Sequence, residues 1–172
     1  MIRVMVVDDH EFVRTMMCEL VDGTDDMQVV GEAPDGSRAL PVAQATRPDV
    51  VLMDLSMPLM NGIDATREVT ASMPEAQVIV LTTSTKGQDV HDAAAAGAVG
   101  FLSKGADPRD VLDAIRAVVT KQLEESRAAG AIGSSLQAEV VVAAPAARDV
   151  LAWGVCWAFV SAMLRGPPRP AG

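Results

Sequence analysis

The stretch that decides the fold is VVLMD, residues 50–54, in which four apolar residues end at an aspartate. Val50 to Met53 has no polar alternation, which is typical of a strand that is covered on both faces. Residues 1–120 contain similar apolar runs at Ile2 to Val7, Met27 to Gly31, Val78 to Leu81 and Val99 to Leu102. We therefore expect five short, buried strands.

Longer amphipathic stretches separate these runs and predict helices. The expected helices span about residues 11–21, 36–46, 62–72, 87–96 and 107–121. Asp35 and Asn61 stand at N-cap positions of two of them, and Pro108 stands at the first position of the last. Strands that alternate with helices in this way predict an α/β fold with a doubly wound parallel sheet.

Size and charge narrow the possible functions. The chain of 172 residues has room for one ordinary domain and a tail. Residues 1–120 contain nine Lys/Arg and nineteen Asp/Glu, so this part should repel nucleic-acid backbones. Cys18 and Cys156 have no spacing typical of a disulfide framework or a zinc site, and the apolar start meets Asp8 too early for a signal peptide. We expect a cytoplasmic protein.

Polar residues follow four of the five predicted strands. Asp8 and Asp9 follow the first, Asp54 the third, Thr82 the fourth and Lys104 the fifth. Because the carboxyl ends of parallel strands meet at one edge, we expect these side chains to converge there. Three carboxylates in one cleft repel one another unless a cation lies between them, and ligand sets of oxygen alone favour Mg²⁺. The sequence therefore predicts a magnesium site beside a phosphoacceptor aspartate.

Each of these residues also has an ordinary structural explanation. Paired acids after a strand often stabilise a helix N-terminus, and a single lysine is usually solvated. Their positions at the ends of different strands favour a common site. His10, which stands beside two acids at a helix start, is interpreted as an exposed or capping side chain and not as a phosphate relay.

Four motifs at the strand ends resemble a known family. They are VVDDH at 6–10, VLMDLSMP at 51–58 followed by Asn61-Gly62, VLTT at 80–83 and AGAVGFLSK at 96–104. Together they resemble the receiver domain of bacterial two-component response regulators over residues 1–120, and most closely the NarL-type subgroup. The resemblance implies a flavodoxin-like or CheY-like sheet with strand order 2-1-3-4-5.

The resemblance also implies roles for the polar residues. Asp54 would be the phosphoacceptor, which takes a phosphoryl group from a sensor histidine kinase. Asp8, Asp9 and Asp54 would bind Mg²⁺ together with the backbone carbonyl of Ser56. Lys104 would contact the phosphoryl group.

Thr82 and Phe101 would form the switch pair of such a receiver. In this family the threonine hydroxyl moves toward the phosphoryl group and the aromatic ring turns inward. This change would reshape the face of the fourth helix, fifth strand and fifth helix, to which a downstream protein or a second copy would bind. Phosphorylation favours the active state only through its differential contacts in the two states.

Two other functions are considered. One is a DNA-binding transcriptional regulator whose output domain is degenerate or truncated. The other is a phosphohydrolase, but a dedicated phosphatase usually has an acid/base carboxylate two residues after its nucleophile, and Ser56 stands there. We expect no enzyme activity beyond Mg²⁺-dependent phosphotransfer to the chain itself and slow self-dephosphorylation.

Residues 121–172 form a linker and an atypical, poorly defined tail. They lack the amphipathic helices and basic surface of a helix-turn-helix, so DNA binding is not supported. An apolar helix is expected near residues 150–164, but at 1.5 Å per residue it is too short to cross a membrane of about 30 Å. This segment is interpreted as a helix that packs on the receiver or on a second copy, as a weak membrane-surface contact, or as the remnant of a truncated or frameshifted gene. Membrane contact is not the favoured interpretation.

Overall fold

The computed structural model describes residues 1–83, 87–129 and 141–142. Its strands are β1 (Ile2–Val7), β2 (Met27–Ala33), β3 (Val50–Asp54), β4 (Gln77–Thr82), β5 (Gly100–Ser103) and β6 (Val141–Val142). Its helices are α1 (Glu11–Asp22), α2 (Gly36–Thr46), α3 (Gly62–Ser72), α4 (Gly87–Ala95) and α5 (Pro108–Ala129).

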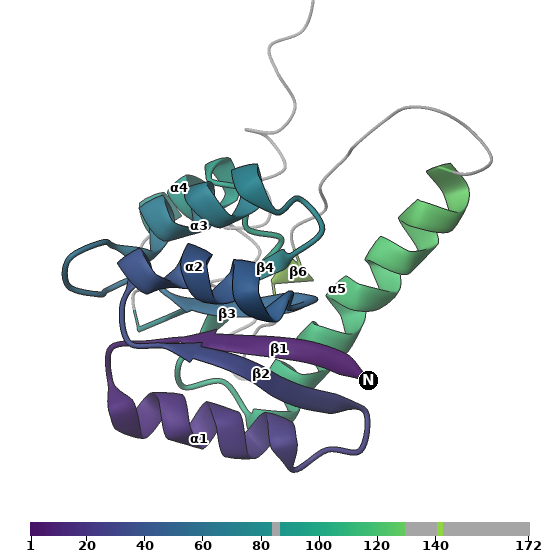
Figure 1. Cartoon of the computed structure of the whole chain (residues 1–172), viewed down its shortest axis with the longest axis horizontal. Coiled ribbons are helices and arrows are strands. Elements are labelled where there is room, and N and C mark those ends of the chain that lie inside the picture. Colours follow the sequence, from purple (N-terminus) through teal and green to yellow (C-terminus); the bar gives the residue numbers. More distant parts are fainter. Residues whose placement is uncertain (84–86, 130–140, 143–172) are drawn as a thin grey trace, which may run out of the picture.

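The strands form one parallel sheet of order β2-β1-β3-β4-β5-β6 (Figure 1). The predicted order of the first five strands is confirmed. The sixth strand is not expected from the sequence: Val141 pairs with Gly100 and Val142 with Phe101, so that β6 lies parallel to β5. A strand of two residues has too short an apolar run to be distinguished by pattern alone.

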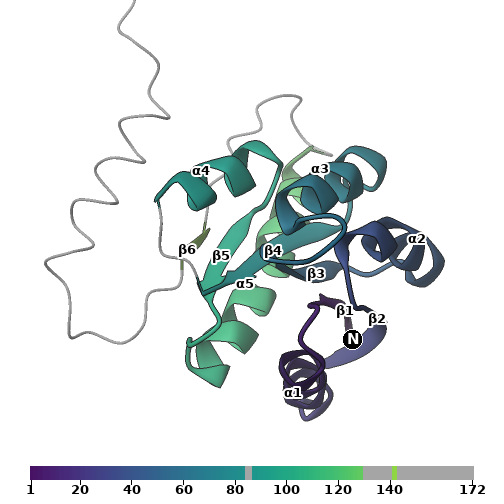
Figure 2. The same ribbon diagram turned by 90° about the vertical axis from the view of Figure 1, so that its left-hand side faces the viewer.

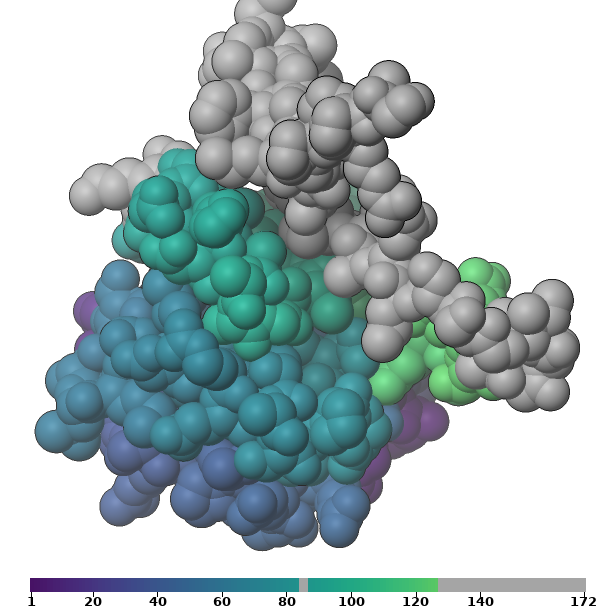
Figure 3. All heavy atoms as spheres, turned by 90° about the horizontal axis from the view of Figure 1, so that it is seen from above, coloured from purple at the N-terminus to yellow at the C-terminus, as the bar shows by residue number. Residues whose placement is uncertain are grey.

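The helices cover both faces of the sheet. Helices α2, α3 and α4 lie on one face, and α1 and α5 lie on the other (Figures 1 and 2). Figure 3 shows α2, α3 and α4 arranged side by side. Along β1, Met5 and Val7 face the first helical layer while Val4 and Val6 face the second, and all four side chains are fully buried. This burial on both faces explains why the strands are continuous apolar runs in the sequence.

Side-chain caps fix the start of two helices. The carboxylate of Asp35 accepts hydrogen bonds from the backbone N–H of Ser37 (2.9 Å) and of Arg38 (3.3 Å) at the start of α2. At α3, Asn61 accepts a bond from the backbone N–H of Asp64 at 2.9 Å, and its amide donates to the Asp64 carboxylate at 2.9 Å. Both caps confirm the helix starts predicted from the sequence.

The last helix is longer than expected. It continues to Ala129, whereas the sequence pattern suggests an end near residue 121. The apolar helix expected near 150–164 lies outside the described residues, as do the other parts of the tail beyond Ala129 except Val141 and Val142. Among the described residues no helix is both long enough and apolar enough to cross a membrane.

Gly62 brings α3 against the end of β3. A Cβ atom at this position would overlap the carbonyl oxygen of Asp54 and lie 2.7 Å from its carbonyl carbon. The backbone N–H of Gly62 donates to the carbonyl of Leu55 at 3.0 Å, which closes the loop between the strand and the helix. Only glycine fits this approach.

Gly62→Ala should therefore lower the free energy of unfolding by about 2 kcal/mol or more, because a backbone shift is needed to accept the methyl group. Gly87→Ala is the matched control, since Gly87 is also the first residue of a helix and a Cβ atom added there would have nothing within 4 Å. Urea unfolding measures both variants. Equal stability of the two would contradict the steric explanation.

An ion pair connects two segments that are far apart in sequence. Arg116 on α5 donates from Nε to Oδ2 of Asp26 at 2.7 Å and from Nη2 to Oδ1 at 3.0 Å. These hydrogen bonds lower the pKa of Asp26 from 3.8 to about 2. The paired carboxylate therefore stabilises the fold above pH 3.8, and this contribution is lost as the pH falls toward about 2.

Asp26→Asn should consequently reduce stability at neutral pH, and its difference from the unmodified chain should shrink as the pH falls from about 4 to about 2. The effect should be small because the pair is exposed. Urea unfolding over this pH range measures it. Asp25→Asn, at an exposed neighbouring position, should show no such convergence.

Candidate functional site

The carboxyl ends of β1, β3, β4 and β5 bring the predicted site residues to one edge of the sheet. Val7 is in register with Met53, so Asp8 and Asp54 follow side by side. Asp54 is in register with Leu81, the residue before Thr82. Asp8, Asp54 and Thr82 are each only 1% exposed.

Lys104 joins the two buried carboxylates. Its Nζ atom lies 2.7 Å from Oδ2 of Asp8 and 2.9 Å from Oδ2 of Asp54. The backbone N–H of Lys104 donates to the carbonyl of Thr82 at 2.9 Å, which fixes the start of the lysine side chain beside the end of β4. Burial lowers the pKa of Lys104, but the contacts with Asp8 and Asp54 outweigh burial and raise this pKa above its ordinary value.

Among the described residues, four of ligand type lie together at this edge: Asp8, Asp9, His10 and Asp54. One ligand atom from each lies within 4.8 Å of the others. In the described part of the chain, no group other than the Lys104 ammonium satisfies the buried Oδ2 atoms of Asp8 and Asp54. Three carboxylates against one ammonium leave two negative charges. A divalent cation bound through oxygen fits this donor set.

Two predicted residues lie at the margin of the site. Ser56 is exposed in the β3–α3 loop, two residues beyond Asp54. Phe101 lies in β5, partly buried, and packs against the core below α2, α3 and α4. Their roles as a metal ligand and as a switch residue stay predictions.

Two supporting residues have structural roles that were not predicted from the sequence, although Gly62 belongs to the Asn61-Gly62 motif quoted above. Arg14 donates from Nη1 to the carbonyl of Asp8 at 2.8 Å and forms an ion pair with Glu32 at 3.3 Å, so it holds the β1–α1 turn. Gly62 allows the close approach to Asp54 described above. The Asn61-Gly62 pair is a usable signal, whereas nothing in the sequence near Arg14 indicates its backbone partner.

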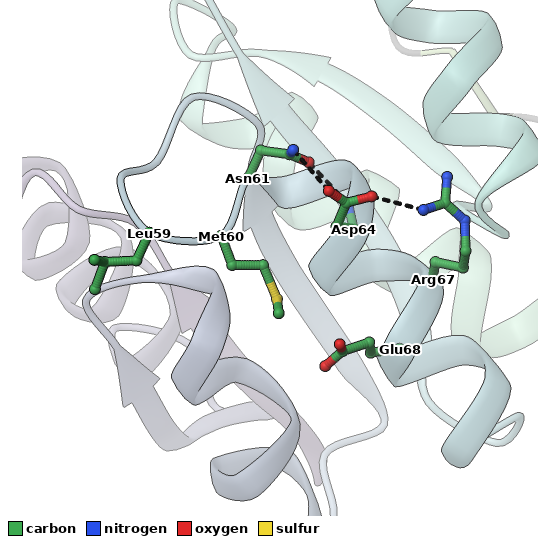
Figure 4. Close-up of a pocket in the computed structure, with 6 residues that line it drawn as sticks. All are labelled: Leu59, Met60, Asn61, Asp64, Arg67 and Glu68. Carbon is green, nitrogen blue, oxygen red and sulfur yellow. Dashed lines mark hydrogen bonds and ion pairs between the residues drawn. The ribbon is translucent and has the colours of Figure 1, made fainter.

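A hollow of about 410 Å³ lies beside this edge, at the β3–α3 loop and the first turns of α3 (Figure 4). Its lining residues are Leu59, Met60, Asn61, Asp64, Arg67 and Glu68, and none of the predicted site residues is among them. Asp64 is held by Asn61 and by Arg67, whose Nη1 lies 2.6 Å from Oδ1 of Asp64. The charge of Asp64 is therefore already paired with that of Arg67 on the same helix.

A family model described as the response regulator receiver domain matches residues 4–116. The chain belongs to the response regulator receiver family. Receiver domains bind Mg²⁺ at an acidic pocket, and this receiver has the corresponding cluster of aspartates.

Relatives support the same assignment. Over 138 residues the receiver is 38% identical to the transcriptional regulatory protein LiaR of Bacillus subtilis, an alignment that covers 80% of this chain and 65% of LiaR. The chain spans between about half and two thirds of the length of the curated relatives it matches.

Solved structures agree with the fold and the subgroup. The receiver domain of the response regulator NarL from Mycobacterium tuberculosis has a TM-score of 0.67 and 31% identity, and the match covers 69% of this chain and 96% of that one. The CheX–CheY–BeF3–Mg²⁺ complex from Borrelia burgdorferi has a TM-score of 0.64 and 27% identity, with 68% and 88% coverage. The predicted likeness to NarL-type regulators is confirmed.

Lys104→Met should lower the free energy of unfolding by about 3 kcal/mol when no divalent ion is present, because it leaves two buried carboxylates uncompensated. The variant Asp54→Asn/Lys104→Met removes one charge of each sign. Its loss should be smaller than the sum of the two single losses, which a double-mutant cycle by urea unfolding measures. Additive losses would show that the ion pair does not couple these residues.

Proposed function

We propose that this receiver is a phosphorylation-controlled signalling switch in which Asp54 accepts a phosphoryl group from a sensor histidine kinase. The observation that carries the proposal is the position of Asp54, a buried carboxylate at the end of β3 whose Oδ2 lies 2.9 Å from the Lys104 ammonium. A cation at this distance stabilises charge on both the carboxylate and an incoming phosphoryl group.

The transfer is a single displacement at phosphorus. An oxygen of the Asp54 carboxylate forms the new P–O bond as the P–N bond of the phosphohistidine breaks. The leaving group is the imidazole of the kinase histidine, and its freed nitrogen takes a proton from water when the ring does not already carry one. Lys104 is placed to turn from Asp8 toward the phosphoryl oxygens, since its Nζ already contacts both carboxylates. The product is an acyl phosphate on Asp54.

Asp8, Asp9, Asp54 and the backbone carbonyl of Ser56 would hold Mg²⁺ in this proposal. Two observations support the fit: among the described residues only the Lys104 ammonium contacts the buried Oδ2 atoms of Asp8 and Asp54, and the cluster keeps two excess negative charges. When bound, Mg²⁺ supplies positive charge that offsets the phosphoryl oxygens as they approach the carboxylates.

Thr82 and Phe101 would report phosphorylation to the surface. Thr82 ends β4, and its backbone carbonyl accepts the N–H of Lys104, so we expect its hydroxyl to reorient toward a phosphoryl oxygen. Phe101 lies on the neighbouring strand, is partly buried and packs against the core below α2, α3 and α4, and in this proposal its ring would turn further inward. Without a hydroxyl, this ring would act by packing alone.

The proposed output surface is the face of α4, β5 and α5, for a downstream protein or a second copy. In this chain β6 pairs with β5 at the same face. The name of LiaR supports the alternative of a DNA-binding transcriptional regulator, although the described residues contain no such output domain. We propose a cytoplasmic protein without enzyme activity beyond its own phosphotransfer and slow dephosphorylation.

The test is phosphorylation of the full chain by acetyl phosphate in Mg²⁺, followed by intact-mass spectrometry. The unmodified chain should gain one phosphoryl group, and Asp54→Asn should gain none, because the amide is not a nucleophile at phosphorus. Asp25→Asn is the control, since Asp25 is exposed and outside the site.

Incorporation that survives unchanged in Asp54→Asn would disprove the assignment. Omission of Mg²⁺ should also prevent incorporation, with Ca²⁺ at equal concentration as a control for ionic strength. Incorporation that is independent of divalent ions would contradict the metal part of the proposal and leave Asp54 as the acceptor.

A further inference from the structure

His10 lies against the acidic cluster and does not cap α1 with its side chain. It occupies the N-cap position of α1, yet its ring makes no capping hydrogen bond. Instead its Nδ1 atom lies 2.8 Å from Oδ1 of Asp9 and 3.6 Å from Oδ1 of Asp8. The side chain is exposed, as the sequence predicts, but it is directed back toward the carboxylates.

The shorter of these distances matches the spacing of ligands around a metal ion. Adjacent ligands of a six-coordinate ion with bonds of about 2.1 Å lie roughly 3 Å apart. The 2.8 Å separation of Nδ1 from Asp9 is close to that value, and the 3.6 Å separation from Asp8 is longer. The ligand atoms of Asp8, Asp9, His10 and Asp54 all lie within 4.8 Å of one another.

The backbone around His10 is already fixed. Its N–H donates to Oδ1 of Asp8 at 2.9 Å, and its carbonyl accepts a bond from the N–H of Arg14 at 3.0 Å. Arg14 in turn holds the carbonyl of Asp8 at 2.8 Å. The imidazole is therefore presented to the cluster by a turn that needs no rearrangement.

The His10 ring can exchange its hydrogen bond to Asp9 for a metal ion without leaving a buried polar group unpaired. To bind a metal, Nδ1 must give up its hydrogen bond to Asp9, and the ring proton must be carried on Nε2. The His10 side chain is 67% exposed, so water satisfies the Nε2 proton. The carboxylate of Asp9 then exchanges a hydrogen bond for the metal.

We infer that His10 is an additional ligand that lets this site prefer softer divalent ions, with Mn²⁺ and Ni²⁺ as representatives, over Mg²⁺. The inference rests on the proposed metal site of Asp8, Asp9 and Asp54. Mg²⁺ binds oxygen and gains little from an imidazole, whereas Mn²⁺ and especially Ni²⁺ accept nitrogen ligands. The residue therefore acts on metal selectivity and not on the presence of the site.

The experiment follows Mn²⁺ binding to the full chain by electron paramagnetic resonance. Spin-echo modulation from ¹⁴N should appear in the unmodified chain and disappear in His10→Ala. His91→Ala is the matched control, because His91 is the other histidine of the chain and its exposed side chain also lies beside an aspartate, Asp92, on α4. Its ¹⁴N signal should be unchanged.

Competition titrations supply the selectivity. His10→Ala should weaken Ni²⁺ binding by at least about tenfold, a loss typical even of groups that only support a metal ligand. Mg²⁺ affinity should stay within about twofold. Equal weakening for both ions would show that His10 acts on the structure of the turn and would overturn the inference.

The outcomes separate this inference from the proposed function. Mn²⁺ that binds with no ¹⁴N modulation leaves the aspartate site intact and disproves ligation by His10. Mn²⁺ that fails to bind, or binds equally well to Asp9→Asn, disproves the metal site itself and the inference with it.

Discussion

The contact of one ammonium with two buried carboxylates is the constraint on which this site depends. Asp8 and Asp54 stand side by side because β1 and β3 are paired in register. The repulsion between their two carboxylates is offset by the ammonium of Lys104, which contacts both. The contact also ties the ends of three strands together. It leaves the cluster short of positive charge, so that the same interaction which stabilises the free domain prepares it for a cation and a phosphoryl group.

Much of this arrangement could be predicted from the sequence. The five main strands and the convergence of Asp8, Asp54, Thr82 and Lys104 follow from apolar runs that end in polar residues, because parallel sheets place those ends at one edge. The strand order was implied by the resemblance to receiver domains. The helix starts at Asp35 and Asn61 could also be predicted, because a capping side chain bonds to backbone N–H groups only two or three residues further along the chain.

The remaining features depend on contacts between distant segments. The orientation of the His10 ring and the hold of Arg14 on the Asp8 carbonyl are set by the β1–α1 turn in three dimensions, and local pattern does not determine either. The extra turns of α5 carry few apolar residues, so their periodicity is weak. β6 is recognised only by the strand it joins.

The short strand β6 bears on how the protein behaves in concentrated solution. An open sheet ends in strands whose free N–H and C=O groups can template aggregation. By pairing with Gly100 and Phe101, β6 occupies the first half of the β5 edge. A strand from another molecule therefore meets an edge that is already partly hydrogen-bonded. It can pair only with the rest of β5, or it must displace β6. Because β6 belongs to the same chain, its effective concentration at β5 is high, and it competes well with a strand from another molecule.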